Sequence, residues 1–116
     1  MFNLHRKIVA ITGGGSGIGR AIAEMFAAQG ANVNILELNA ATGEETVKQI
    51  ISKGGIAKTY TCNVADQGQV KEVLSDIAKQ FDRLDILVNC PGISHIGRLD
   101  HTSQQDFDRI FKVKVK

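Results

Sequence analysis

TGGGSGIG, at residues Thr12–Gly19, is the most informative segment of this sequence. The apolar run Lys7–Ile11 precedes it and has the composition of a fully buried parallel strand. The residues that follow predict a helix, whose apolar face would hold Ile18, Ile22, Met25 and Phe26. A glycine-rich turn between a buried strand and a helix presents backbone N–H groups at the positive end of the helix, where phosphate groups bind. The sequence therefore predicts a phosphate-binding turn.

The spacing of the glycines narrows the class of ligand. The common dinucleotide pattern G-x-G-x-x-G does not fit, because a start at Gly13 would require glycine in place of Ile18. A Walker A loop does not fit either, since Arg20 stands where the phosphate-binding lysine is needed. The arrangement that fits is Gly13-x-x-x-Gly17-x-Gly19, with a tight exit from the strand, close approach to a pyrophosphate and close helix packing. A glycine-rich turn without a ligand is the alternative.

Composition and charge argue against several functional classes. The 116 residues are expected to form one domain, spanning 1–116, and the net charge of +2 is too small and dispersed to indicate nucleic acid binding. No apolar run approaches membrane-spanning length, and the N-terminus lacks the core of a signal peptide. These features predict a cytoplasmic protein without a membrane partner.

Cysteine and histidine are too scattered to predict a metal site or a disulfide. Cys62 and Cys90 are expected at the ends of two strands that the predicted strand order keeps apart. Two isolated cysteines fit no metal-ligand spacing, and the three histidines are His5, His95 and His101, none of which shares a helical face with another.

Strands and helices are predicted to alternate along the whole chain. Three further strands are predicted, at Asn32–Glu37, Ile56–Cys62 and Leu84–Asn89. Alternation at this spacing indicates right-handed βαβ crossovers. The predicted fold class is therefore α/β: a Rossmann-like parallel sheet of strand order 3-2-1-4 with helices on both faces.

The helices between these strands carry capping and periodicity signals. Thr42–Glu45 resembles a capping box, followed by an apolar stripe of Val47, Ile50 and Ile51 and by stop signals at Gly54 and Gly55. Asp66 is expected to cap the next helix, whose buried face would comprise Val70, Val73, Leu74, Ile77 and Phe81.

The last part of the chain is compatible with more than one secondary structure. Cys90–His101 is expected to be a loop, and a final helix opening at Thr102 would carry Phe107, Ile110 and Phe111. The segment Phe111–Lys116 also alternates with period two, so a strand is an alternative there.

Four segments, in the same order, resemble the short-chain dehydrogenase/reductase family. Thr12–Gly19 matches its cofactor signature, and Asn63–Asp66 resembles its Asp-Val-x-Asp segment. Leu84–Gly92 resembles its Leu-Asp-x-Leu-Val-Asn-Asn-Ala-Gly strand and loop, and Phe107–Val113 is similar to the stretch leading into its catalytic-domain helix. The resemblance covers the whole chain. It implies an oxidoreductase that transfers hydride between a nicotinamide dinucleotide and an alcohol or ketone.

The resemblance also implies a dinucleotide site built from matching positions. These are Gly13, Gly15, Ser16, Gly17, Ile18, Gly19, Glu37, Leu38, Asn63, Val64, Asn89, Cys90, Pro91 and Gly92. Glu37 stands at the end of the second predicted strand, where a carboxylate accepts both ribose hydroxyls and repels a 2′-phosphate. The expected cofactor is therefore NAD in preference to NADP. Asn63, Cys90 and Pro91 depart from the family's residues, and Pro91 also removes a backbone donor.

The catalytic residues of the family are missing from this chain. The family uses a tyrosine as acid/base, a lysine four residues later, a serine and often a relay asparagine. The only tyrosine is Tyr60, which has Val64 four residues later and is expected to be a packing residue. The relay position aligns with Lys114. Family members are about twice as long, so the chain is expected to bind cofactor without turnover and to be incomplete at its C-terminus.

Two alternatives remain at this stage. The chain could be an interaction or structural module that self-associates through an open edge at Leu84–Asn89 and the apolar face of its last helix. It could also be a fragment of a longer reading frame, which would restore the dehydrogenase role.

Overall fold

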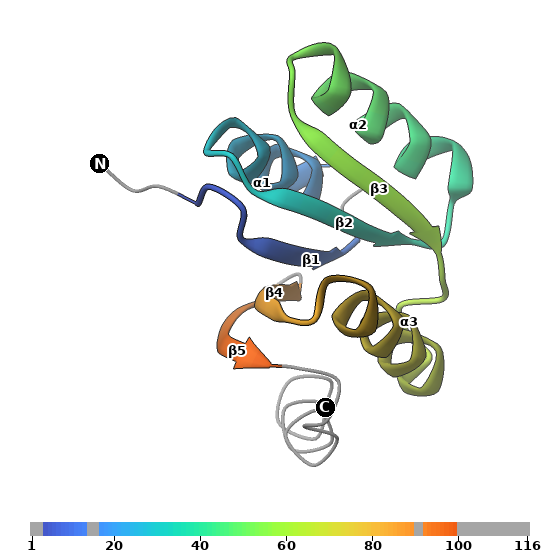
Figure 1. The fold of residues 1–116 in the computed structure, drawn as a ribbon. Helices are drawn as coiled ribbons and strands as arrows, with labels where there is room; N and C mark the ends of the chain where they lie inside the picture. The colour runs from blue at the N-terminus through green and yellow to red at the C-terminus, as the bar shows by residue number, and fades with distance from the viewer. Residues whose placement is uncertain (1–3, 14–16, 90–91, 100–116) are drawn as a thin grey trace.

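A computed structural model describes residues 4–13, 17–89 and 92–99 of the chain (Figure 1). Within these residues, five strands form a single sheet in the order β3-β2-β1-β4-β5. In chain order the elements are β1 (Ile8–Thr12), α1 (Gly17–Ala28), β2 (Asn32–Glu37), α2 (Ala40–Ser52), β3 (Ile56–Thr61), α3 (Gln67–Phe81), β4 (Leu84–Asn89) and β5 (Gly92–Leu99).

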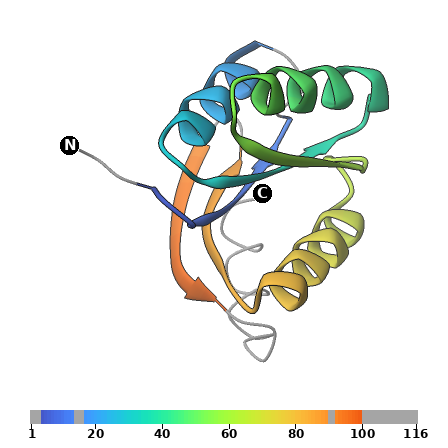
Figure 2. The same cartoon turned by 45° about the horizontal axis from the view of Figure 1, so that its top comes forward.

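The first four strands confirm the predicted parallel sheet of order 3-2-1-4. β1 pairs in parallel with β2 and β4, and β2 pairs in parallel with β3. Helices α1 and α2 lie side by side over one face of the sheet, and α3 covers the other face (Figure 2). The chain is therefore the three-layered α/β arrangement that strand–helix alternation predicts.

The two faces of the sheet carry separate apolar clusters. Alternate residues of the strands point to opposite faces, so neighbouring residues of β1 such as Val9 and Ala10 enter different clusters. The α3 side is packed by Val70, Leu74, Ile77 and Ala78, with Val73 and Phe81 partly buried, as the periodicity predicts. Asp66 is the N-cap of α3 and its Oδ1 accepts from the backbone N–H of Gln69 over 3.2 Å, which confirms the predicted cap.

The predicted buried face of α1 is wrong in part. Ile18 is 77% exposed and Met25 is 54% exposed. The residues of α1 that are buried are instead Gly19, Ala23, Phe26 and Ala27. Small residues let the helix approach the sheet closely, and this leaves Ile18 and Met25 toward solvent, while the predicted Ile22 packs partly buried against the core.

The predicted cap of α2 is also displaced. The N-cap is Asn39, whose side chain accepts from the backbone N–H groups of Ala41 and Thr42, and Thr42 lies inside the helix. Val47 and Ile50 are buried as predicted, but Ile51 is 56% exposed. The helix ends at Ser52, and Gly54 adopts a φ of +86°, which agrees with the predicted stop.

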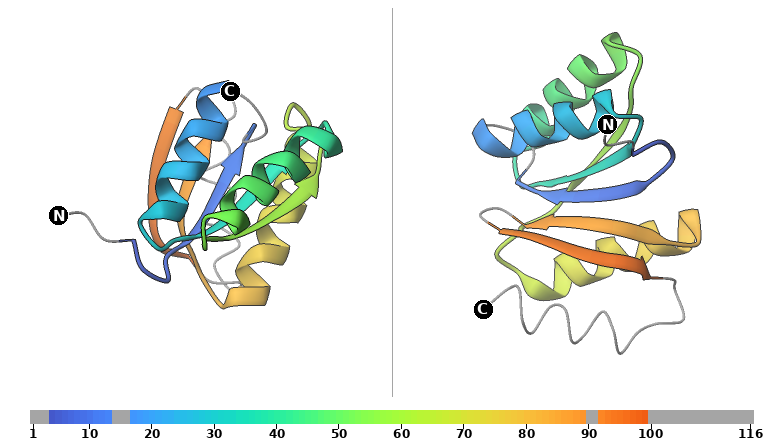
Figure 3. Two further views of the ribbon diagram at one scale, coloured as in Figure 1. Left: turned by 90° about the horizontal axis from the view of Figure 1, so that it is seen from above. Right: turned by 90° about the vertical axis from the view of Figure 1, so that its left-hand side faces the viewer.

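The expected loop after β4 is replaced by a strand. Gly92–Leu99 forms β5, which pairs with β4 in an antiparallel register and lies beside it at the end of the sheet (Figure 3). The prediction that Leu84–Asn89 is an open edge is therefore wrong. An unpaired row of N–H and C=O groups on a buried apolar strand is costly, and β5 supplies the missing partners. The final helix or strand expected after Thr102 lies outside the described residues.

Charged residues join β1 and β4 at their amino ends. Asp85 is buried, and its Oδ2 accepts a hydrogen bond from the backbone N–H of Ile8 over 2.8 Å and forms an ion pair with Nε of Arg83 at 3.0 Å. The guanidinium of Arg83 also donates to the carbonyl of Arg6 over 2.6 Å. These contacts fix the start of β1 against the start of β4. They help to hold the register of the two strands, which also aligns Thr12 with Asn89 at their carboxyl ends.

Candidate cofactor site

The carboxyl ends of four parallel strands meet at one edge of the sheet. Thr12 is the register partner of both Leu36 and Asn89, and Glu37 is the partner of Thr61. Helix α1 follows β1 on one face of the sheet, and α3 precedes β4 on the other face (Figure 2). The carboxyl edge of the parallel strands is where open α/β sheets bind ligands.

The glycine turn begins with a backbone conformation that favours glycine. Gly13 has a φ of +73° and Gly17 has a φ of +61°, and no atom lies within 4 Å of the position that a Cβ would occupy on either residue. A side chain here would be strained by the backbone rather than by a neighbour. Gly19 is buried in the contact of α1 with the sheet. Gly15 and Ser16, which the sequence also assigns to the site, lie outside the described residues.

A backbone hydrogen bond ties this turn to β2. The N–H of Gly13 donates to the carbonyl of Leu36 over 2.8 Å. Leu36 directly precedes Glu37, so the exit of β1 and the acidic end of β2 form one continuous surface. The structure thus brings together the two parts of the site that the sequence assigns to pyrophosphate and to ribose.

The end of β4 is joined to the end of β1 through side chains. The hydroxyl of Thr12 donates to Oδ1 of Asn89 over 2.8 Å, and the same hydroxyl lies 3.5 Å from the carbonyl of Val88. This bond fixes the orientation of the Asn89 carboxamide at the carboxyl end of β4. The sequence places Asn89 in the site but gives no signal for the part played by Thr12.

Glu37 is partly buried and its carboxylate is engaged by the following turn. Oε2 of Glu37 accepts from the backbone N–H of Asn39 over 3.2 Å. Leu38, between them, is 62% exposed. Asn39 is not among the residues that the sequence assigns to the site, although asparagine directly before a helix is a recognised N-cap signal.

Asn63 and Val64 follow β3 at the same edge. The Oδ1 of Asn63 accepts from the backbone N–H of Ala65, and its own N–H donates to Oε1 of Gln69, both over 3.0 Å. Val64 is 36% exposed. The side chain of Asn63 therefore shapes the turn into α3, and Val64 presents apolar surface beside it.

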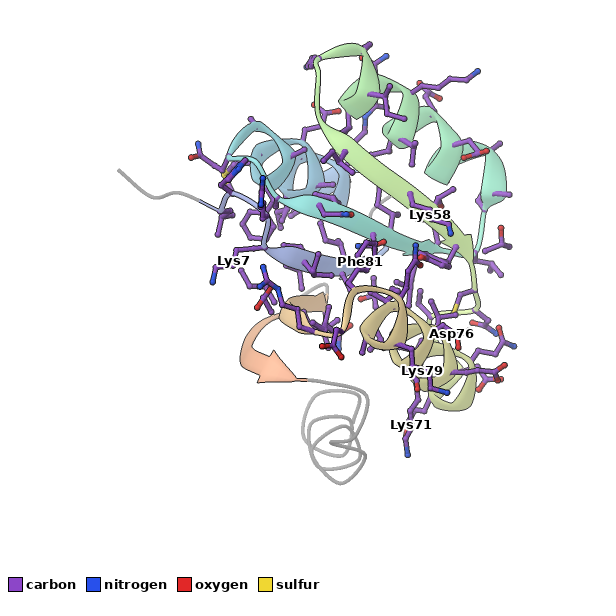
Figure 4. All side chains as sticks on the ribbon, viewed as in Figure 1. Lys7, Lys58, Lys71, Asp76, Lys79 and Phe81 are labelled. Atoms are coloured by element: carbon purple, nitrogen blue, oxygen red, sulfur yellow. The ribbon has the colours of Figure 1, made fainter. Side chains whose placement is uncertain are left out.

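Tyr60 has the environment of a packing residue. It is partly buried against the α3 cluster, and its hydroxyl lies 3.4 Å from Oε1 of Gln80. Nζ of Lys58 lies 5.1 Å from the ring centroid, and Asp76 stands on the neighbouring helix (Figure 4). Burial, and secondly the charge of Asp76, raise the pKa of the phenol, so this tyrosine holds its proton firmly.

Cys62 is a buried free thiol, 2% exposed. Burial, and secondly the carboxylate of Asp66, raise the pKa of its thiol, which makes it a weak nucleophile.

Cys90 and Pro91 lie outside the described residues, but Asn89 and Gly92 on either side of them are register partners. In the described ranges, no group of three His, Cys, Asp or Glu side chains could hold a metal ion, and no helix is long and apolar enough to cross a membrane.

Comparisons with known proteins agree with this geometry. The sequence pattern of the short chain dehydrogenase family matches residues 7–116. The chain is 43% identical over 114 residues to an uncharacterised oxidoreductase of Thermotoga maritima, and it is 34% identical over 114 residues to a D-threitol dehydrogenase of Mycolicibacterium smegmatis. These alignments cover 98% of this chain but only 45% and 44% of the two relatives. The chain therefore spans less than half the length of these proteins.

A solved structure extends the same likeness. A 7α-hydroxysteroid dehydrogenase complexed with NADH and 7-oxo glycochenodeoxycholic acid matches with a TM-score of 0.71 and 33% identity. The match covers 77% of this chain and 37% of that one.

Proposed function

Because this chain belongs to the short-chain dehydrogenase family, a family of oxidoreductases, we propose that it forms the NAD(H)-binding half of such an enzyme and binds dinucleotide without turnover on its own. The observation that supports this most directly is the hydrogen bond from Gly13 to Leu36, which sets a glycine turn of positive φ directly beside Glu37. The NADH-bound relative supports a nicotinamide dinucleotide as the ligand.

We assign a binding role to each part of the site. The turn Gly13–Gly19, with Gly15, Ser16, Gly17 and Ile18, would donate backbone N–H groups to the pyrophosphate. Glu37 and Leu38 would hold the adenosine ribose, and Asn63 and Val64 would meet the adenine. Asn89–Gly92, with Cys90 and Pro91, would bound the other half of the cofactor. The bound nicotinamide would supply the hydride chemistry, and these residues would bind and orient it.

NAD is the proposed cofactor in preference to NADP. Glu37 is the only carboxylate among the proposed site residues, and it is held at the end of β2 by the N–H of Asn39. A carboxylate in this place accepts the two ribose hydroxyls, whereas a 2′-phosphate would bring a second negative charge against it. Titration with NADH and NADPH tests the assignment, and equal affinity for both would reject it.

The glycine turn offers a sharp test of cofactor binding. We expect the unmodified chain to bind NADH in a fluorescence titration and Gly17→Val to abolish that binding. The matched control is Gly54→Val, because Gly54 also has a positive φ with open space at its Cβ but lies in the turn after α2. Loss of binding in both variants would point to unfolding, and retained binding in Gly17→Val would contradict the proposed turn.

The absence of turnover is a separate proposal. Tyr60 holds its proton and lies on the α3 side of β3, so it does not meet the requirements of the family's acid/base. We expect no NADH oxidation when the 116-residue chain is incubated with a panel of ketones.

We also propose that the chain is one cofactor-binding unit, incomplete at its C-terminus. We further propose that it resides in the cytoplasm, and the buried free thiol of Cys62 supports this location.

One of the two supports for the alternative, an interaction module, is removed, because it required an open edge at β4 and that edge is paired with β5. The other support, the apolar face of the last helix, lies outside the described residues. Cofactor binding is the function that the glycine turn and Glu37 favour.

A further inference from the structure

The coenzyme preference proposed above depends on where the Glu37 carboxylate is held. The backbone N–H of Asn39 donates to Oε2 of Glu37 over 3.2 Å and so contacts the carboxylate directly. The first turn of α2 lies over the base of the same side chain, because a Cβ added to Gly43 would lie 3.5 Å from the Cβ of Glu37 and 3.3 Å from the Cβ of Thr59.

The backbone of Asn39 is itself held by its own side chain. Oδ1 of Asn39 accepts from the N–H of Ala41 over 3.0 Å and from the N–H of Thr42 over 3.3 Å. The carbonyl of Asn39 accepts from the hydroxyl of Thr42 over 3.0 Å and from the N–H of Gly43 over 3.1 Å. With a φ of −87° and a ψ of 105°, the residue is extended, and the caps fix the direction of its N–H.

We propose that Asn39 is a positioning residue for coenzyme choice, because its cap of α2 aims its backbone N–H at Glu37 and holds that carboxylate at the end of β2. This inference rests on the proposed function. Asn39 acts through Glu37 and needs no contact with the dinucleotide. Without the cap, the direction of this N–H is no longer fixed, and the carboxylate loses one of the contacts that hold it. The ribose hydroxyls of NADH then lose a well-ordered acceptor, which weakens the binding of NADH. The 2′-phosphate of NADPH meets a less fixed negative charge, which strengthens the binding of NADPH, so both effects reduce the preference for NADH.

The test compares cap variants in the full 116-residue chain. Asn39→Ala and Asn39→Gly both remove the side-chain acceptor, and the glycine variant disturbs folding less because glycine is tolerated at N-caps. We expect the ratio of NADPH to NADH dissociation constants to fall by about threefold to tenfold in both, the size expected when one hydrogen bond to a charged group is loosened. Asn39→Ser restores a neutral cap and should restore the ratio.

The matched control is Val47→Ala in the same helix. Val47 is buried in the core cluster and makes no part of the cap, so its truncation weakens α2 without releasing Glu37. We expect a lowered melting temperature with an unchanged coenzyme ratio. A ratio that falls equally in Val47→Ala would reduce Asn39 to a structural role and overturn the proposal.

Amide hydrogen exchange of Ala41 and Thr42 shows whether each variant has lost the cap. If both amides exchange faster in Asn39→Ala and Asn39→Gly while the coenzyme ratio stays that of the unmodified chain, the proposal is wrong although the proposed function stands. If Glu37→Ala also leaves the ratio unchanged, the assignment of Glu37 fails, and the role of Asn39 fails with it. A chain that binds neither nucleotide rejects both.

Discussion

The hydroxyl of Thr12 and the carboxamide oxygen of Asn89 lie 2.8 Å apart and join the ends of β1 and β4. The two residues are register partners at the carboxyl ends of neighbouring parallel strands, so this bond ties the strands together at the edge of the sheet where the candidate site lies. At the amino ends of the same two strands, the carboxylate of Asp85 accepts a hydrogen bond from the backbone N–H of Ile8. β1 and β4 are therefore locked at both ends by side chains, which gives the site a rigid base.

Replacing the Thr12 hydroxyl by a methyl group should loosen that base. Thr12→Val keeps the shape of the side chain but leaves Oδ1 of Asn89 without this donor, so we expect a loss of about 1 kcal/mol in the free energy of unfolding. Urea unfolding measures it. Thr61→Val is the control, because Thr61 ends the exposed strand β3, and a change near zero is expected there. Equal effects at the two sites would contradict a special role for the Thr12–Asn89 pair.

Removing the Asp85 carboxylate should cost more. Asp85→Ala leaves the N–H of Ile8 without its acceptor and Arg83 without its counter-ion, so we expect a loss of about 2–3 kcal/mol, the range for breaking a buried charged hydrogen-bond network. Thermal and urea unfolding should agree. Glu72→Gln, on the exposed side of α3, removes the same formal charge and should leave stability nearly unchanged. A loss below that of Thr12→Val would show that the amino-end contacts are weak.

Stability should fall at alkaline pH. The folded state raises the pKa of the Cys62 thiol and of the Tyr60 phenol, chiefly through burial. The folded chain therefore keeps these protons at pH values where the unfolded chain has released them, and stability that is fully present below the unfolded pKa values is lost as pH rises through the folded ones. For Cys62 the decline begins above about pH 9.

Urea unfolding at several alkaline pH values measures this decline. Cys62→Ala should show a shallower decline than the unmodified chain, and adding Tyr60→Phe should flatten it further. A decline of the same steepness in the double variant would assign the pH dependence to other groups.

The antiparallel partner of β4 should be visible in hydrogen exchange. Because β5 pairs with β4, the backbone amides of Ile86, Leu87 and Val88 should all be protected, whether they face β1 or β5. Alternate fast and slow amides along β4 would instead show an open edge. Sedimentation over a concentration series is the companion measurement for self-association. Because both sides of β4 are paired, any association must use a surface other than β4.

The parts of the fold that follow from local patterns could be predicted from the sequence. The sequence predicts the bounds of β4 at Leu84 and Asn89 and the cap of α3 at Asp66, because each depends on a few adjacent residues. The face of α1 could not be read in this way. Ile18 and Met25 are apolar, but the close approach of Gly19 and Ala23 to the sheet determines which side is buried. That choice is made by packing between elements.

The remaining errors have a similar cause. Thr42 and Asn39 are both acceptable caps by residue type, and the end of β2 determines which one begins the helix. The sequence does not predict β5, because apolar and polar residues do not alternate regularly in Gly92–Leu99. The strand forms by pairing with β4, whose backbone N–H and C=O groups need partners. In the site, the glycine spacing and Glu37 were found from motifs, whereas the supports at Thr12 and Asn39 depend on contacts that a motif does not contain.

The direction of β5 determines where the polypeptide leaves the sheet. A parallel strand would have ended beside Asn89, at the same edge as Gly13 and Glu37, but β5 runs back and brings Leu99 opposite Leu84, at the amino ends of the other strands. A residue that follows Leu99 must travel the length of a strand, roughly 20 Å for six residues at about 3.3 Å each, before it can reach the glycine turn. The candidate ligand site therefore lies at the carboxyl ends of the parallel strands, whereas β5 ends at their amino ends.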